Sequence, residues 1–163
     1  MITIVRFQLG RPITPVSTTQ SLEVTLETLI ESIDLAESIV KRVAEASGFD
    51  EDDTHKIGMA VREGVINAYN YGNSQERQKK IVLTVELEGE KMVVHITDEG
   101  PGFDLSQVPD PLAEENLLRT SGRGIFLIKA FMDEFSVQRG PNGGAEIVMT
   151  KKLPQTVPAP GRA

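Results

Sequence analysis

The chain has 163 residues, of which 39% are hydrophobic and 25% charged, ordinary values for one globular domain with a core of its own. Its formal net charge of -7 argues against nucleic acid or an anionic membrane surface as the main partner. It contains no cysteine, which excludes disulfides, thiol catalysis and zinc sites built on cysteine. We find no apolar run of the roughly 20 residues that a membrane span needs and no signal-peptide pattern, so we expect a cytoplasmic protein.

Composition separates a globular part from two ends. We expect residues 1–20 to form a partly disordered extension, because Pro, Thr and Ser dominate its second half. Residues 154–163 have almost nothing to bury and are expected to be a C-terminal tail. The domain proper is therefore predicted over residues 21–153.

The domain begins with a strand and two helices. Alternating apolar residues in SLEVTLE predict a strand over 21–27. Helical spacing follows over 29–48, where Ile39 or Val40 completes the apolar stripe, and again over 50–73, which opens with acidic residues and ends at a glycine.

The second half of the domain is predicted to consist of two hairpins separated by a helix. The first hairpin covers 80–98 and the second covers 134–153, with PNGG at its turn. Between them, GRGIFLIKAFMD predicts a short apolar helix over 122–133. This order of elements predicts an α+β fold, a two-layer sandwich in which helices cover one face of a mixed, mostly antiparallel sheet.

The second long helix carries polar residues opposite its core stripe. Glu63, Asn67 and Asn70 are spaced i, i+4 and i+7, and so share one face. A solvated surface would explain such a face, but a glutamate can also act as a general base and an asparagine oxygen can bind Mg²⁺. The core stripe on the other side is predicted to be Ile57, Val61, Val65 and Ala68.

The stretch VVHITDEGPGFD places a carboxylate at the end of a strand and follows it with glycines. An ordinary turn accounts for Asp98, Gly100 and Gly102. Alternatively, the Asp98 carboxylate accepts a hydrogen bond from the exocyclic amine of adenine while the glycines let the purine approach the main chain.

A third stretch, TSGRGIFLIKA, places Gly122 and Gly124 at the start of a helix. Glycines there serve as ordinary caps, but free N–H groups and the helix dipole also make such a start a phosphate-binding site. No Lys-Ser/Thr pair follows, so the stretch is not a Walker loop. The apolar face of this helix is predicted to contain Ile125, Ile128 and either Phe131 or Met132.

These motifs resemble, in one order and spacing, the asparagine box and the two glycine boxes of the gyrase–histidine-kinase–MutL ATPase superfamily, the Bergerat fold. The quoted residues are REGVINAYNYGN, DEGPGFD and SGRGIFLIKAFMDEF. Their details look most like the anti-sigma-factor serine kinases, and the resemblance covers about residues 21–153. The chain has Tyr71 before Gly72, where many relatives have His-Gly.

The resemblance implies a role for each motif residue. Glu63 would be the catalytic base, Asn67 the Mg²⁺ ligand and Asp98 the acceptor of the adenine amine. An ATP lid is implied over residues 103–121. The remaining nucleotide-binding residues would be Asn70 in the asparagine box, Gly100 and Gly102 beside the purine, and Ser121, Gly122, Arg123 and Gly124 at the phosphates.

The same resemblance implies a function. The protein would bind ATP or ADP with Mg²⁺, sequester a sigma factor and phosphorylate a serine of a small anti-anti-sigma antagonist of STAS type. We also expect a homodimer, with the strand of residues 21–27 at a sheet edge. The alternatives are a nucleotide-dependent binding switch without kinase activity and an ATP-driven clamp of the MutL or gyrase type, which the short chain disfavours.

Overall fold

The computed structural model describes residues 5–9, 20–102 and 120–155. In these residues six strands form one sheet in the order β1-β2-β3-β4-β6-β5, and every neighbouring pair is antiparallel. The predicted α+β sandwich is confirmed. The elements in chain order are β1 (Val5–Leu9), β2 (Gln20–Glu27), α1 (Glu31–Ala46), α2 (Glu51–Asn67), the π-helix η1 (Ala68–Gly72), β3 (Lys80–Glu88), β4 (Lys91–Asp98), α4 (Thr120–Phe131), β5 (Glu134–Arg139) and β6 (Ala145–Lys152).

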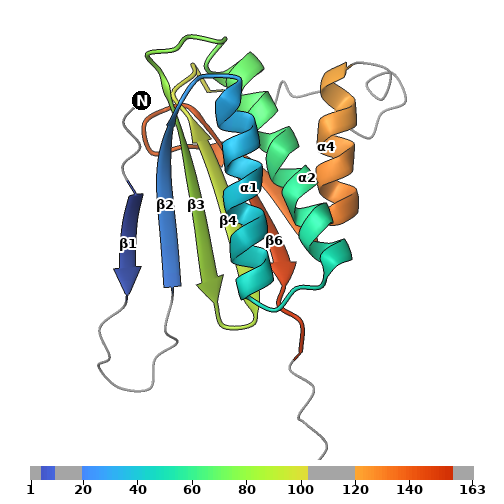
Figure 1. Cartoon of the computed structure of the whole chain (residues 1–163). Coiled ribbons are helices and arrows are strands. Elements are labelled where there is room, and N and C mark those ends of the chain that lie inside the picture. The colour runs from blue at the N-terminus through green and yellow to red at the C-terminus, as the bar shows by residue number, and fades with distance from the viewer. Residues whose placement is uncertain (1–4, 10–19, 103–119, 156–163) are drawn as a thin grey trace, which may run out of the picture.

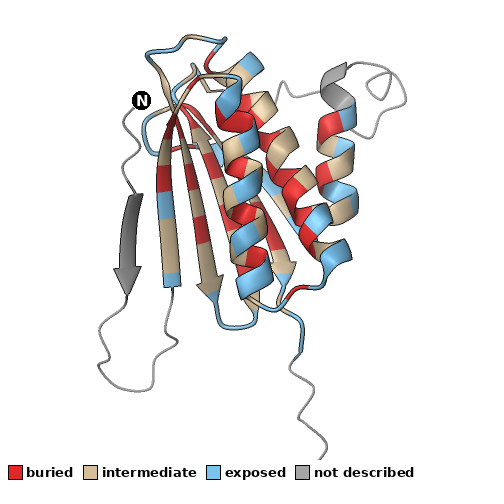
Figure 2. Cartoon of the chain, viewed as in Figure 1, coloured by how far each residue is buried: buried red, intermediate tan, exposed pale blue. Residues whose placement is uncertain are grey.

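The helices α1, α2 and α4 lie side by side on one face of the sheet (Figure 1). Strand residues alternate between buried and partly exposed along β3 and β4, as a sheet covered on one face requires (Figure 2). The buried strand residues form one cluster with buried residues of the helices. None of the described helices has the length and apolar character needed to cross a membrane.

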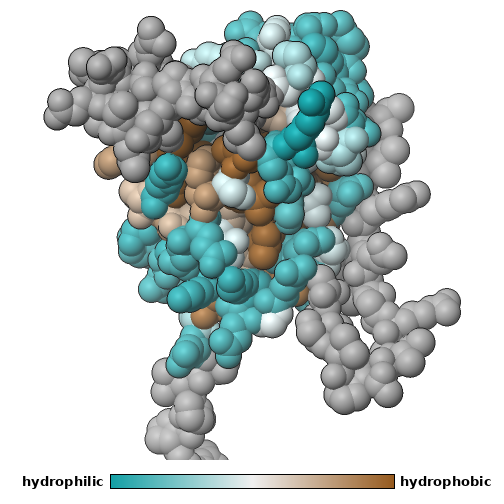
Figure 3. All heavy atoms as spheres, turned by 180° about the vertical axis from the view of Figure 1, so that it is seen from behind, coloured by the Kyte–Doolittle hydropathy of each residue, from teal (hydrophilic) through white to brown (hydrophobic). Residues whose placement is uncertain are grey.

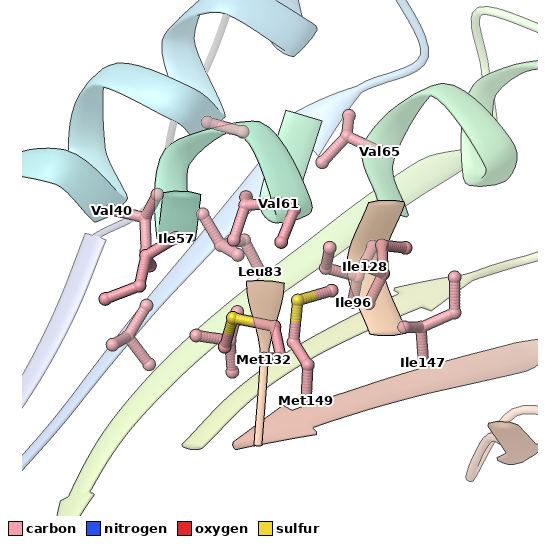
Figure 4. Packing of buried hydrophobic residues seen from close by; sticks show 14 of the residues in the cluster. Val40, Ile57, Val61, Val65, Leu83, Ile96, Ile128, Met132, Ile147 and Met149 are labelled. Carbon is pink, nitrogen blue, oxygen red and sulfur yellow. The ribbon is translucent and has the colours of Figure 1, made fainter. Parts of the chain in front are cut away.

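The core lies between the three helices and the central strands (Figure 4). The predicted α2 stripe of Ile57, Val61, Val65 and Ala68 is buried throughout. At the two positions where the spacing left a choice, Val40 of α1 is buried more fully than Ile39, and Met132, directly after α4, is buried more fully than Phe131.

The opposite face of the sheet is mainly hydrophilic, with a few apolar residues toward its middle (Figure 3). Its central residue is His95 of β4, whose Nδ1 lies 3.1 Å from Glu146 Oε1 on β6 and whose Nε2 lies 3.8 Å from Glu86 Oε2 on β3. The polar strand positions therefore pair with one another across the strands.

The position of β2 differs from the expectation. Residues 5–9, within the expected N-terminal extension, form β1 and pair with β2 along its outer side. The expectation that β2 lies at a sheet edge is therefore wrong, because β1 and β5 are the outermost described strands.

The C-terminal end of α4 is tied to the base of the domain. Lys151 Nζ donates to the carbonyl oxygen of Phe131, the last residue of α4, at 3.0 Å. The same ammonium lies 3.4 Å from Asp53 Oδ1 in the first turn of α2. Asp133 then donates its N–H to the Thr150 carbonyl oxygen at 2.9 Å, so the chain joins β6 directly after the helix.

Two glycines in α2 give a matched test of helix-to-sheet packing. A methyl group on Gly64 would lie 2.5 Å from Ile96 Cδ1 in the core, whereas one on Gly58 would meet the flexible Lys41 side chain at 2.8 Å. Alanine raises helix propensity at both positions by about 1 kcal/mol. Only at Gly64 does it overpack the core, which costs about 1–3 kcal/mol.

We therefore expect Gly64→Ala to have a lower free energy of unfolding than Gly58→Ala, by about 1–3 kcal/mol in urea denaturation. Equal stability of the two variants would show that α2 does not press against the sheet at Gly64.

Candidate active site

The three sequence motifs meet at one end of the domain. In Figure 1 the C-terminal end of α2 with η1, the end of β4 and the start of α4 all lie at the upper end, together with the loop between β5 and β6. The chain directions cause this meeting, because α2 and β4 run toward that end and α4 starts from it.

Glu63 on α2 faces the beginning of α4. A Cβ on Gly124 would lie 2.6 Å from Glu63 Oε2, so the carboxylate rests directly against the glycine. This places a partly exposed acid beside the N-terminal turns of a helix, where the helix dipole is positive. The structure thus brings the first and third motifs together.

The cation next to Glu63 in sequence points elsewhere. Arg62 Nη1 contacts Asp34 Oδ1 at 2.6 Å and Glu37 Oε2 at 2.9 Å, both on α1. The hydrogen bonds to these carboxylates raise the pKa of the Arg62 guanidinium above its ordinary value.

Asn67 lies one helical turn beyond Glu63, is the last residue of α2 and is partly exposed.

The chain changes from α-helix to π-helix directly after Asn67. In η1 the hydrogen bonds span five residues, as in the 2.7 Å bond from the Asn73 N–H to the Ala68 carbonyl oxygen. A π-helix turns by a smaller angle per residue than an α-helix, so the 3.6-residue spacing no longer gives the direction of side chains after Asn67. Asn70 is exposed and its Oδ1 accepts from Gln75 Nε2 at 3.0 Å, while Tyr71 is 59% exposed.

Asp98 ends β4 with a buried carboxylate that is only 5% exposed. Its Oδ1 accepts two backbone hydrogen bonds, from Gly100 at 2.9 Å and from Ala145 at 3.0 Å. Its Oδ2 lies beside Gly72 at the end of η1. One oxygen therefore holds the local backbone together, and the other faces the asparagine box.

Glycines surround this carboxylate because side chains would collide with it or its neighbours. A Cβ on Gly72 would overlap the Asp98 carboxylate, and one on Gly144 would overlap the Asp98 carbonyl oxygen. A Cβ on Gly100 would overlap the backbone of Gly72. The chain's own close packing thus requires glycine at these positions, in addition to any ligand.

The first glycine box needs both conformational freedom and space at Gly102. Gly102 has φ +71°, and a Cβ there would lie 2.5 Å from the Gly143 carbonyl oxygen.

The predicted phosphate-binding residues lie in α4, which starts at Thr120. The first turn therefore contains Ser121 and Gly122, with the exposed Arg123 after them. Most of the predicted lid, residues 103–119, lies outside the described residues.

Three residues of this site were missed in the sequence. Ala145 and Gly144 follow the hairpin turn PNGG and reach Asp98 from the other end of the domain's sequence. Gly143 has φ +90°, so the turn itself requires a glycine there. Gly144 does not have a positive φ, so its lack of a side chain was the signal in the sequence that another part of the backbone approaches closely. Asn73 is fully buried and bonds the Glu99 N–H at 2.8 Å, a role that an amide in a turn does not reveal.

Comparison with known proteins identifies this arrangement. Residues 26–151 match the family described as the histidine kinase-like ATPase domain. The chain belongs to this family. The resemblance drawn from the three motifs is thereby confirmed, and the match spans η1, the end of β4 and the whole of α4.

Curated relatives narrow the comparison. The chain is 34% identical to the anti-sigma F factor of Bacillus subtilis (strain 168) over 104 residues, which cover 63% of this chain and 71% of that protein. It is 29% identical to the serine-protein kinase RsbW of Staphylococcus aureus over 139 residues, covering 81% of this chain and 86% of that protein.

A solved structure shows the same fold. The crystal structure of the RsbU and RsbW domains of Rv1364c from Mycobacterium tuberculosis superposes with a TM-score of 0.58 at 20% sequence identity. The match covers 82% of this chain and 32% of that one, so this chain spans about a third of that protein's length.

Two substitutions of Asp98 separate the roles of its two oxygens. Asp98→Asn keeps Oδ1 as an acceptor for both backbone N–H groups and replaces only Oδ2 by a donor. Asp98→Ala leaves the buried N–H of Ala145 and the partly buried N–H of Gly100 without their acceptor, and an unsatisfied buried donor costs about 1–3 kcal/mol.

We expect urea denaturation to show Asp98→Ala less stable than wild type by about 2 kcal/mol or more, and Asp98→Asn within about 1 kcal/mol of wild type. An equal loss in both variants would show that the bonds to Oδ1 do not hold this end of β4.

Proposed function

We propose that this protein is an ATP-binding anti-sigma factor and protein serine kinase, which binds its nucleotide at the site around Glu63 and Asp98. In one state it sequesters a sigma factor, and in the other it phosphorylates a serine of a small anti-anti-sigma antagonist of STAS type. The observation that carries the site is the buried Asp98 carboxylate, with one oxygen fixed by backbone N–H groups and the other directed toward the asparagine box.

The adenine end of the site follows from this geometry. Adenine presents an exocyclic amine, which is a donor, and an ionised carboxylate is an acceptor only. In this proposal Asp98 Oδ2 accepts from that amine, and the purine lies beside the main chain of Gly100 and Gly102, which carry no side chains. Guanine carries an acceptor at the corresponding position and would be repelled.

The phosphate end lies where Glu63 meets α4. The first four N–H groups of a helix have no partner within it, so those of Thr120, Ser121, Gly122 and Arg123 are available to an anion. Gly124 lets Glu63 approach this helix start closely. Asn70 is a further proposed contact on the asparagine box.

A magnesium ion fits the proposed site through Asn67. This side chain is partly exposed, offers an uncharged oxygen, and lies one helical turn from Glu63. Mg²⁺ is usually held by one or two protein oxygens together with nucleotide phosphates and water. When bound, it would neutralise charge on the phosphates.

In the transfer step, Glu63 would accept the proton of the substrate serine hydroxyl. The serine oxygen then forms the new bond to the γ-phosphorus as the bond to the β-phosphate oxygen breaks, and ADP leaves. The N–H groups of α4 would hold the phosphate oxygens, and Asp98 would fix the nucleotide at its other end.

A nucleotide-dependent binding switch with little or no transfer is the alternative. Tyr71, which is 59% exposed, stands where the resemblance of the asparagine box implies histidine. A cytoplasmic location and a homodimer are also part of the proposal, although β1 takes the sheet edge that β2 was expected to offer.

Nucleotide binding is tested first. We expect calorimetry to show that the wild type binds ADP in the presence of Mg²⁺ and that Asp98→Asn weakens this binding about tenfold or more, because the amide places a donor against the adenine amine. ADP affinity equal to wild type in a folded Asp98→Asn protein would remove Asp98 from the adenine site.

Kinase activity is tested with two variants on one helix face. Glu63→Gln removes proton acceptance but keeps the side-chain size, so we expect nucleotide binding to survive while single-turnover transfer falls about 10²–10⁴-fold. Asn67→Ala should lose both tight ATP binding and transfer, since it removes the metal contact.

Transfer and ATP affinity should be measured side by side on an antagonist that the protein binds. Undiminished transfer by Glu63→Gln would reject the base assignment. Failure of the wild type to phosphorylate such an antagonist would favour the binding switch over the kinase.

A further inference from the structure

Asn73 is a fully buried polar residue at the end of the asparagine box, directly after Gly72. Its backbone N–H bonds the Ala68 carbonyl oxygen at 2.7 Å and so closes the π turn η1. Its side chain lies in the interior, at a junction where it meets three chain segments, those of Thr28, Lys80 and Glu99. At 0% exposure it is not a surface residue that contacts a nucleotide.

The side chain of Asn73 uses all its polar groups in this junction. Its Oδ1 accepts from the Glu99 N–H at 2.8 Å. Its Nδ2 donates to the Lys80 carbonyl oxygen at 2.9 Å and to Thr28 Oγ1 at 2.7 Å. A flipped amide would set donor against donor at Glu99 and acceptor against acceptor at Lys80, so only one orientation satisfies these partners.

The contact to Glu99 bears directly on Asp98. Glu99 lies between Asp98 and Gly100, the residue whose N–H holds Asp98 Oδ1. The carboxylate of Glu99 accepts from the Lys80 N–H at 2.6 Å, which closes a ring of hydrogen bonds around the end of β4. Asn73 directly follows Gly72, and its side chain therefore ties the end of η1 to the backbone on the C-terminal side of Asp98.

We infer that Asn73 is a positioning residue for the adenine subsite, because it sets the separation between Asp98 and the asparagine box. Gly72 packs against the Asp98 carboxylate, so a shift of either segment changes the position of Oδ2. This inference rests on the proposed adenine recognition by Asp98. It assigns base selectivity to a side chain that acts only through the backbone of its neighbours.

Thr28 offers a matched control in the same cluster. Its Oγ1 accepts from Asn73 Nδ2 and donates to the Lys79 carbonyl oxygen at 2.8 Å, on the side of the junction away from Glu99. Thr28→Val therefore removes buried hydrogen bonds but leaves the bond from Glu99 to Asn73 in place. Both Thr28→Val and Asn73→Ala should lower the melting temperature.

The affinities for ADP and GDP are to be measured by calorimetry at a temperature at which circular dichroism shows each protein folded. We expect Asn73→Ala to lose about tenfold or more in ADP affinity and to discriminate less between ADP and GDP. Thr28→Val should keep the wild-type ratio of the two affinities. Amide hydrogen exchange at Glu99 should be faster in Asn73→Ala than in Thr28→Val.

Wild-type ADP affinity and selectivity in a folded Asn73→Ala protein would overturn the inference, as would an equal loss of selectivity in Thr28→Val. If Asn73→Ala does not fold, Asn73→Ser provides the same test, because its short hydroxyl cannot bond Glu99 and Lys80 together. A wild type that binds no ADP would instead reject the proposed function itself.

Discussion

The buried carboxylate at the end of β4 is the constraint on which this end of the molecule depends. A buried anion must be compensated, and here two backbone N–H groups from different segments bond Oδ1 of Asp98. The N–H of Ala145 reaches this oxygen from the start of β6, and the β5–β6 loop comes so close that Gly144 cannot carry a side chain. Gly72 of η1 packs against the same carboxylate and cannot carry one either. The strand end and the loop are therefore held by hydrogen bonds to one side chain, and the π turn is in close contact with it.

The second half of the site depends on packing between helices. Glu63 has no such network in the described residues and is placed by the contact of α2 with α4 at Gly124. Arg62 next to it is held by α1, which keeps its charge away from the glutamate. The two ends of the site thus have different physical origins, a polar network at one end and close helix packing at the other.

Local signals in the sequence were sufficient for most of the fold. Alternation and helical spacing predicted the strands from β2 onward and the three helices, because burial on one face imposes those periods. The structure brings residues of the three motifs together at one end of the domain. The π turn after Asn67 could not be predicted, since no residue type specifies it, and the contact of Ala145 with Asp98 spans 47 residues. The short β1 lies in residues 1–20, which were expected to be an extension because residues 10–20 are rich in Pro, Thr and Ser, although VRFQL itself contains none of these.

The anchoring of α4 at its C-terminal end has a mechanical consequence. Lys151 and Asp133 hold that end, and the 12-residue helix extends from it as an arm of about 18 Å. A tilt of about 5° around the anchored end would move the first residue by about 1.5 Å. Displacements of about 1 Å are enough to change catalytic rates strongly. The position of the start of α4 beside Glu63 is therefore sensitive to the ion pairs at the base of the domain as well as to the packing of α4 against α2.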